Sequence, residues 1–350
     1  MKILLCIVLI ITTVIINEYT QTIRVVRHSR AYADSELVPF GGVDHARVIE
    51  IKNQPKSSEL LIYSDNTIES TKQFHYNSLS SLPVVTSNDD FADVFLAARD
   101  VRKAHSHTLY FGESKILQVL RTGEAVERDC DYGEPVVIAV SSDRIALLFF
   151  NLTIENREGS GLIGTTSFCI STSGLDPTTA IPKPIELENS SSLVYLGVWM
   201  KKEAEYCRPV FLFSEIGCNK EELIFSVEIA GDQIQINRHW LNSKLRPFGT
   251  RNIVFKDGQL NRIEAFDLSK LRSLDELSES GHLAMDLQDS RLIDLEVSTS
   301  MEWYLLLENQ TTHVRTIEIV SDGKALKSEH ERAIVAASTI LVRGNTVFVW

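Results

Sequence analysis

Residues 303–326 read WYLLLENQTTHVRTIEIVSDGKAL and show most clearly how this chain is built. The apolar run Trp303–Leu307 leads into a polar turn, and the second run, Val314–Val320, ends at the turn Asp322-Gly323. Short apolar and β-branched runs that alternate with turn residues predict antiparallel strands joined by tight turns. The segment therefore predicts consecutive strands of one small sheet.

The same texture covers most of the chain. Comparable runs are Leu60–Tyr63, Thr108–Phe111, Ile116–Leu120, Ile145–Phe150, Val194–Trp199, Val210–Phe213, Leu223–Ile229, Ile253–Phe255 and Thr339–Val342. Further turns are expected at Gly231-Asp232, Asp257-Gly258 and Arg343-Gly344-Asn345, because Gly, Asn and Asp tolerate a positive φ at little cost. The fold class is therefore predicted to be all-β.

A weak internal repeat suggests how the strands are grouped. Thr108–Val126, TLYFGESKILQVLRTGEAV, has the same order of strand, polar turn, strand and glycine turn. The turn glycines Gly123, Gly231 and Gly323 are 108 and 92 residues apart, and half of each interval is 54 and 46 residues. Units of about 40–50 residues with four strands are typical of β-propeller blades. We expect a single β-propeller domain of six or seven blades over residues 23–350.

Two stacked β-sandwich domains are the alternative architecture. Their best boundary is the proline cluster Pro177, Pro182 and Pro184, which one long surface loop explains equally well. The C-terminal sequence TILVRGNTVFVW, residues 339–350, reads as a hairpin and favours the propeller. An unpaired edge of this composition would aggregate, so we expect the last strand to close the ring against the other end of the chain.

Helices are expected at few places. Asp90–Lys103 carries Phe91, Val94, Phe95, Ala98 and Val101 at helical spacing, after possible caps at Ser87 and Asn88. Leu268–Leu277 and Ser328–Ala337 are weaker candidates.

The N-terminus predicts export. Lys2 precedes Ile3–Ile16, an unbroken run of 14 apolar or Thr residues. A membrane-spanning helix needs about 20 residues, so this length suits the apolar region of a signal peptide over residues 1–22. Thr20 and Thr22 are the only small residues suitably placed for cleavage. An uncleaved N-terminal anchor and a buried strand of a cytosolic protein are the alternatives.

The cysteines agree with an oxidising compartment. Besides Cys6 in the leader, the chain has four, an even number that reads as two disulfides in an exported protein. Of three possible pairings, Cys130–Cys169 and Cys207–Cys218 are favoured because each joins neighbours in the chain. Four unpaired thiols are the alternative, and the absence of C-x-x-C argues against zinc.

Three sequons are predicted glycosylation sites on exposed turns. They are Asn151-Leu-Thr, Asn189-Ser-Ser and Asn309-Gln-Thr. Asn189 ranks first because it begins a Ser-rich loop, and Asn309 is next, at a predicted hairpin tip.

The charge balance excludes one class of partner. Removal of residues 1–22 takes away Lys2 and Glu18, which leaves 34 basic against 46 acidic residues and a net charge of −12. Such a surface repels phosphate backbones, so no nucleic-acid partner is expected. Beyond the leader we expect no membrane insertion.

Three local motifs resemble binding sites, and each has a simpler explanation. Gly159-Ser-Gly161-Leu-Ile-Gly164 matches G-x-G-x-x-G but is followed by a predicted strand, so a glycine-rich hairpin is expected in place of a dinucleotide site. His105-Ser-His107 would present two imidazoles on one face of a strand, yet it lacks a third metal ligand. Asn88-Asp89-Asp90 with Asp93 suits calcium, but helix capping explains it equally. Asp129 and Asp131, beside Cys130, are read as solvated loop charges.

The sequence carries no G-x-S-x-G or H-E-x-x-H motif, and no catalytic residue or cofactor is assigned. The chain is therefore interpreted as a secreted binding module with protein or glycan partners. An extracellular hydrolase or lyase that uses carboxylates or calcium at the channel mouth is one alternative, and a membrane-anchored receptor ectodomain is another.

Overall fold

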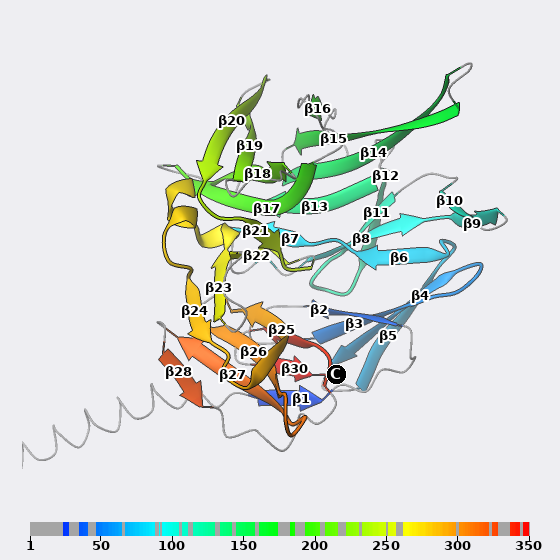
Figure 1. Ribbon diagram of the computed structural model, residues 1–350. Coiled ribbons are helices and arrows are strands. Elements are labelled where there is room, and N and C mark those ends of the chain that lie inside the picture. The colour runs from blue at the N-terminus through cyan, green and yellow to red at the C-terminus, as the bar shows by residue number, and fades with distance from the viewer. Residues whose placement is uncertain are drawn as a thin grey trace, which may run out of the picture.

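Figure 1 shows the computed structural model of the 350-residue chain, which consists almost entirely of strands. It describes residues 24–27, 35–40, 47–64, 67–87, 91, 93–104, 107–110, 115–129, 134–141, 145–157, 161–173, 183–185, 193–203, 207–215, 222–230, 233–249, 251–256, 262–298, 301–321, 324–327, 337–343 and 346–349.

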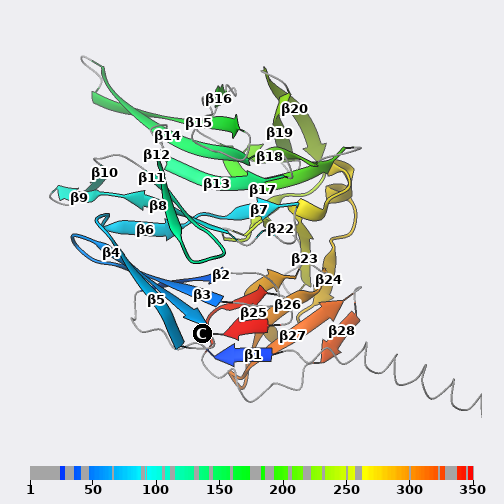
Figure 2. The same cartoon turned by 180° about the vertical axis from the view of Figure 1, so that it is seen from behind.

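Six sheets of four or five strands stand in a ring, so the molecule is a six-bladed β-propeller (Figures 1 and 2). The predicted all-β propeller is confirmed, and the two-sandwich alternative is wrong because the sheets form one ring. Each predicted strand run lies within a strand of the structure or extends at most one residue beyond it.

The strands of the six blades have these bounds. Blade 1 contains β2 (Glu36–Phe40), β3 (Arg47–Asn53), β4 (Ser58–Ser64) and β5 (Thr67–Phe74). Blade 2 contains β6 (Ser78–Ser81), β8 (Val94–Arg99), β11 (Lys115–Val119) and β12 (Ala125–Asp129). Blade 3 contains β7 (Val84–Thr86), β13 (Glu134–Val140), β14 (Ile145–Arg157), β15 (Gly161–Ser173) and β16 (Lys183–Ile185). Blade 4 contains β17 (Leu193–Lys202), β18 (Cys207–Glu215), β19 (Glu222–Ala230) and β20 (Gln233–Leu241). Blade 5 contains β21 (Leu245–Pro247), β22 (Ile253–Lys256), β23 (Arg262–Asp267) and β24 (Leu283–Asp286). Blade 6 contains β25 (Ser290–Val297), β26 (Trp303–Asn309), β27 (Arg315–Ser321) and β28 (Lys324–Lys327).

Both ends of the chain meet in a further three-stranded sheet, the closing sheet. It has the order β1 (Arg24–Arg27), β30 (Thr346–Val349) and β29 (Ile340–Arg343). β29 and β30 form the predicted C-terminal hairpin, and β1 pairs in parallel with β30. Because β29 contacts both β25 of blade 6 and β2 of blade 1, this sheet joins the last blade to the first. The predicted closure is confirmed.

The chain passes from blade 2 into blade 3 for one strand and then returns to complete blade 2. β6 and β7 follow one another in sequence, but β6 pairs antiparallel with β8 in blade 2 and β7 pairs in parallel with β13 in blade 3. Leu82 and Pro83 bridge the two blades through hydrogen bonds with Phe95 and Ile138. The inner strand of blade 3 therefore comes from before the rest of blade 2.

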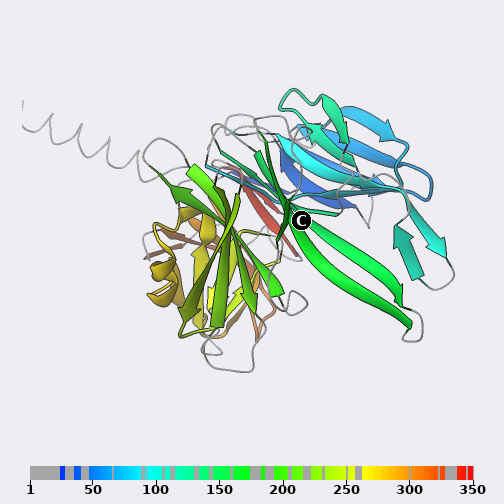
Figure 3. The same ribbon diagram turned by 90° about the horizontal axis from the view of Figure 1, so that it is seen from above.

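Two hairpins extend from this side of the ring. β14 and β15 have 13 residues each, and the ribbon of β9 (Val101–Ala104) and β10 (His107–Tyr110) projects beside them (Figure 3).

The helix predicted over Asp90–Lys103 is wrong. Within this range the described residues form β8 and β9, and every residue from Val94 to Ala98 is buried. A strand buried on both faces is a continuous apolar run, and such a run contains helical spacing by chance.

The other helical predictions have mixed outcomes. Leu268–Leu277 contains two short 3-10 helices, η3 (Leu268–Lys270) and η4 (Leu274–Ser278), and no α-helix. They turn their leucines Leu268, Leu274 and Leu277 into the core between blades 4 and 5. Of Ser328–Ala337, all but Ala337 lies outside the described residues.

Candidate functional site

A cavity of about 440 Å³ lies at the centre of the ring, and we call it the central cavity. Its walls come from blades 1, 2, 3, 5 and 6 and from the closing sheet, mostly from their inner strands and the residues next to them. Such a volume suits a small ligand or a narrow segment of a larger one. Six charged side chains line the cavity: Glu36, Asp93, Arg251, Asp267, Lys270 and Glu296.

The four carboxylates of the central cavity already accept structural hydrogen bonds or ion pairs. Glu36 accepts from the backbone and hydroxyl of Ser81. Asp93 accepts from Gln118 Nε2 at 2.8 Å and from the Arg121 backbone at 3.0 Å.

Asp267 and Glu296 are engaged in the same way. Asp267 accepts from Ser269 N and Oγ, at 3.0 and 2.6 Å. Burial raises the pKa of Asp267, while the bonds from Ser269 and the charge of Lys270 lower it in part. Glu296 pairs with Arg251 at 3.3 Å.

Arg251 joins three parts of the ring. Its Nη2 donates to Asp294 of β25 at 2.9 Å and to the Ile340 carbonyl of β29 at 3.0 Å. Asp294 in turn accepts from the Ile340 N–H at 2.8 Å. This cation is therefore committed to holding blades 5 and 6 against the closing sheet.

Lys270 is the cation that stays available. It is half-buried at the end of η3 and lines the central cavity. Among the described residues nothing forms a hydrogen bond or ion pair with its ammonium group. An anionic group of a ligand in the central cavity would meet this charge.

The sequence singled out Asp93, and it does reach the central cavity, but not at a helix N-terminus. Its predicted neighbours Asn88, Asp89 and Asp90 lie outside the described residues, as does Asp131, while Asp129 ends β12. In the described part of the chain no group of three or more His, Cys, Asp or Glu side chains is arranged to hold a metal ion.

The structure covers only half of the predicted histidine pair. His107 begins β10 and pairs with Ala104, the last residue of β9, whereas His105 lies outside the described residues.

The glycine motif is a hairpin, as predicted. β14 ends at Arg157 and β15 begins at Gly161, so Gly161 and Gly164 lie in a strand and do not open a helix.

The cysteine pairing stays a prediction. Cys169 and Cys207 form no disulfide with each other, and no two described cysteines are within disulfide distance. Their expected partners Cys130 and Cys218 lie outside the described residues. Burial raises the pKa of the Cys169 thiol.

The three sequons differ in position. Asn151 lies within β14, opposite Ser167, and not on a turn, because β14 runs to Arg157 and is longer than the predicted run. Asn189 lies outside the described residues.

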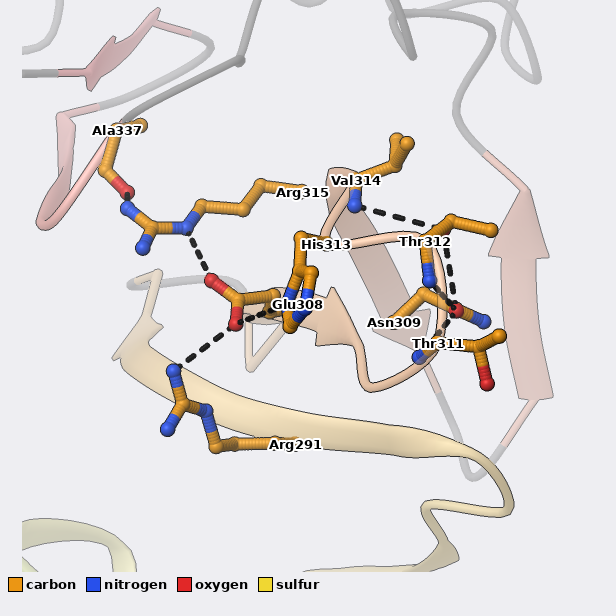
Figure 4. Close-up of polar contacts among 9 residues, drawn as sticks. All are labelled: Arg291, Glu308, Asn309, Thr311, Thr312, His313, Val314, Arg315 and Ala337. Carbon is orange, nitrogen blue, oxygen red and sulfur yellow. Dashed lines mark hydrogen bonds and ion pairs between the residues drawn. The ribbon is translucent and has the colours of Figure 1, made fainter.

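Asn309 stands at the predicted hairpin tip between β26 and β27 (Figure 4). Its Oδ1 accepts from Thr311 N and Thr312 N, at 3.0 and 2.9 Å, and these bonds fix the turn. No described residue forms a hydrogen bond with its amide nitrogen.

The leader, residues 1–22, lies outside the described residues. Among those that are described, no helix is long and apolar enough to cross a membrane.

Sequence reasoning missed Glu36, Arg251, Asp267, Lys270 and Glu296. They come from three separate blades, and no local spacing connects them. The one feature of the sequence that could have pointed to these residues is the presence of a polar residue at the start or end of an apolar strand run.

No known protein family matches the chain, and no curated protein is similar to it. Several solved structures have a distant likeness to it. Synechocystis apocarotenoid oxygenase has 10% identity over 85% of this chain and 71% of its own, with a TM-score of 0.45. Prolyl oligopeptidase B from Galerina marginata has 13% identity over 89% of this chain and 46% of its own, with a TM-score of 0.47. The mannose phosphorylase MPT-4 from Leishmania mexicana has 10% identity over 89% and 94%, with a TM-score of 0.32. Likenesses this distant carry no information on activity.

Proposed function

We propose that this chain is a secreted β-propeller that acts as a binding module and takes part of a protein or glycan partner into the central cavity. The observation that carries the proposal is the state of the charged groups there. The four carboxylates of the central cavity and Arg251 are held in contacts that build the ring. Lys270 lowers the pKa of Asp267 through its charge, but its ammonium group faces the cavity without a described hydrogen bond or ion pair.

This arrangement favours binding over acid–base chemistry. A general acid or base needs a carboxyl group that is free to exchange a proton with a substrate. A preorganised polar cavity with one available cation instead orients an anionic group of a ligand. The cavity has four carboxylates against two cations, so the proposed ligand is a polar segment that brings a single carboxylate, sulfate or phosphate group to Lys270 and keeps that group away from the carboxylates.

The test uses the purified mature chain, from residue 23, on an array of neutral and anionic glycans and acidic peptides. We expect binding to anionic probes, and Lys270→Glu should weaken it roughly tenfold or more because it replaces an attraction by a repulsion. Lys56→Glu is the matched control, because Lys56 is exposed in the β3–β4 turn and does not line the central cavity. The proposal would be contradicted if Lys270→Glu bound the anionic probes as tightly as the wild type does, or if the protein released cleaved products from the probes.

The export proposal has a separate test. Expression of the full chain in a eukaryotic secretory host should release protein whose first residue lies near residues 18–23. Endoglycosidase treatment should lower its mass, and alkylation without reduction should leave Cys130, Cys169, Cys207 and Cys218 unmodified. An intact Met1 in the membrane fraction would favour the anchored receptor instead.

A further inference from the structure

A second cavity, of about 220 Å³, lies between blade 4 and η4 of blade 5, and we call it the blade 4 groove. Its floor is one face of the sheet β17–β20, with Trp199 on β17, Ser226 and Glu228 on β19, and Asn237 and His239 on β20. Leu274 and Asp275 of η4 form the opposite wall. The groove is separate from the central cavity, with which it shares no residue.

A fixed aromatic ring is the first feature of the blade 4 groove. The Trp199 indole is half-buried, and its Nε1 donates to the Leu271 carbonyl at 2.8 Å. That bond and the packing against the core between blades 4 and 5 hold the ring in one orientation. An aromatic ring held in this way offers an apolar contact surface without a cost in side-chain entropy.

Open polar groups are the second feature. Asn237 and Asp275 are exposed, and nothing in the described part of the chain bonds to their side chains. His239 shares one hydrogen bond, 3.0 Å long, between its Nε2 and Ser226 Oγ, which leaves its Nδ1 without a described bond. Together they provide an amide, a carboxylate and an imidazole nitrogen around one small space.

The charge in the groove is the third feature. Glu228 is buried and pairs with Lys201 at 3.3 Å and with Arg208 at 3.1 Å. Arg208 also pairs with Glu203 at 3.1 Å. These charges cancel, so the groove has no surplus cation to select an anion, and the open carboxylate of Asp275 would repel one.

We propose that the blade 4 groove binds one neutral sugar ring of a glycan. A pyranose has an apolar face of C–H groups that fits an aromatic ring and a rim of hydroxyls that need both donors and acceptors. Trp199 supplies the first requirement, and Asn237, His239 and Asp275 supply the second. This inference does not depend on a ligand in the central cavity.

The experiment titrates the mature chain with four methyl glycosides: the β-glucoside, the β-galactoside, the α-mannoside and the N-acetyl-β-glucosaminide. Tryptophan fluorescence and saturation-transfer NMR report binding. We expect a saturable response to at least one of them, and weaker binding of the corresponding glucuronide.

Three variants assign the response to the groove. Trp199→Phe should abolish the fluorescence change and weaken binding in the NMR assay about tenfold. Asn237→Ala should weaken it by a similar factor, and because this residue is exposed the variant tests the groove even if Trp199→Phe does not fold. Trp240→Phe is the matched control, since Trp240 is 67% exposed on β20 but does not line the groove.

The proposal is overturned if none of the four glycosides gives a saturable response. It is also overturned if Asn237→Ala binds as the wild type does, or if Trp240→Phe removes the response. Loss of binding to anionic probes in Lys270→Glu with intact glycoside binding would separate this site from the central cavity.

Discussion

Two asparagine side chains each bond to the backbone N–H and C=O of one residue in the neighbouring blade, as a paired strand would. We call each such contact an asparagine clamp. Asn252, before β22 of blade 5, accepts from the Val198 N–H at 2.7 Å and donates to the Val198 carbonyl at 2.8 Å. Asn53 of blade 1 makes the same pair of bonds with Leu79 of blade 2, at 2.7 and 2.9 Å. Blades lack backbone pairing with one another at these points, so the amide satisfies groups that would otherwise stay unpaired.

Asn252→Ala should lower the free energy of unfolding by about 2–4 kcal/mol, because it leaves both backbone groups of Val198 without a partner. Urea denaturation followed by far-UV circular dichroism measures the change. Asn242→Ala is the control, since Asn242 is exposed and should change stability by less than about 0.5 kcal/mol. Equal free energies of unfolding for the two variants would show that the asparagine clamp at Asn252 does not stabilise the fold.

The clamp also explains Gly197. A Cβ at this position would lie 2.5 Å from Asn252 Oδ1 and 2.6 Å from Leu268 Cδ1, and its φ is +150°. The glycine lies at a bulge between β17 and β18. Only a residue without a side chain lets the asparagine approach so closely.

Glu308 on β26 of blade 6 lies among three basic side chains (Figure 4). Arg315 Nε donates to it at 2.7 Å and Arg291 Nη2 at 2.9 Å, and His313 Nδ1 lies 3.6 Å away. Arg315 also donates to the Ala337 carbonyl, which ties β27 to the segment before the closing sheet. The hydrogen bond from Arg315 is the main reason why the pKa of Glu308 lies below its ordinary value.

A carboxyl group whose pKa is lower in the folded state contributes stability above its unfolded pKa and loses it as pH falls through the folded pKa. Glu308→Gln should therefore lower the melting temperature at pH 7. The difference from the wild type should shrink as pH falls from about 5 towards 3, where the wild-type carboxyl also becomes neutral. Thermal melts over this range test it, with the exposed Glu124→Gln as control. A gap that stays constant with pH would contradict this account.

β8 shows why strands of a propeller are easily mistaken for helices. Val94, Leu96 and Ala98 belong to a core with residues of β3 and β4 in blade 1, whereas Phe95 and Ala97 belong to a core with residues of β13 and β14 in blade 3. A blade between two neighbours buries both faces, so the alternation of polar and apolar residues that marks a one-sided strand is missing. The hairpins outside such strands, such as those at Gly123 and Asn309, were predictable because turn chemistry is local.

If both faces of β8 are core, truncation on either face should be costly. Phe95→Ala and Leu96→Ala should each reduce the free energy of unfolding by about 2–5 kcal/mol. Ile68→Ala on β5, where the side chain is 55% exposed, should cost little. Denaturant titration of the three variants measures this, and a small effect at either position 95 or 96 would mean that one face of β8 is not packed.

The candidate site was harder to predict than the strands. Of the charged residues in the central cavity, only Asp93 belonged to a motif, and the motif suggested a different role for it. Glu36 and Lys270 are 234 residues apart, and Lys270 and Glu296 belong to different blades, so the ring is what brings the three together. Convergence of this kind is a property of the closed fold, which no window of sequence contains.

The ring as a whole depends on its two ends. Without β1, the outer side of β30 would be an unpaired edge, and without β29 the innermost strand β25 of blade 6 would lose its neighbour. Val347 and Val349 of β30 are buried, and Ile340 of β29 accepts a hydrogen bond from Arg251 through its carbonyl and donates one to Asp294 through its N–H. Because each blade packs against the next, weakening the contact between the closing sheet and its neighbours should lower the stability of the whole ring.

Two chains that differ only in β1 test this dependence. One begins at residue 23 and keeps β1, and the other begins at residue 28 and lacks it. The parallel pairing of Arg24–Arg27 with Thr346–Val349 covers four residue pairs, so its loss should cost roughly 2–4 kcal/mol in the free energy of unfolding.

Hydrogen exchange followed by mass spectrometry locates the effect. In the shorter chain, peptides that cover β30 should lose protection first, and those that cover β29 and β25 should follow, because these strands are the next ones inward from the exposed edge. Protection within blade 4, on the far side of the ring, should fall only with global unfolding. If β30 stayed fully protected without β1, the ring would be held by the C-terminal hairpin alone, and the N-terminal strand would not take part in its closure.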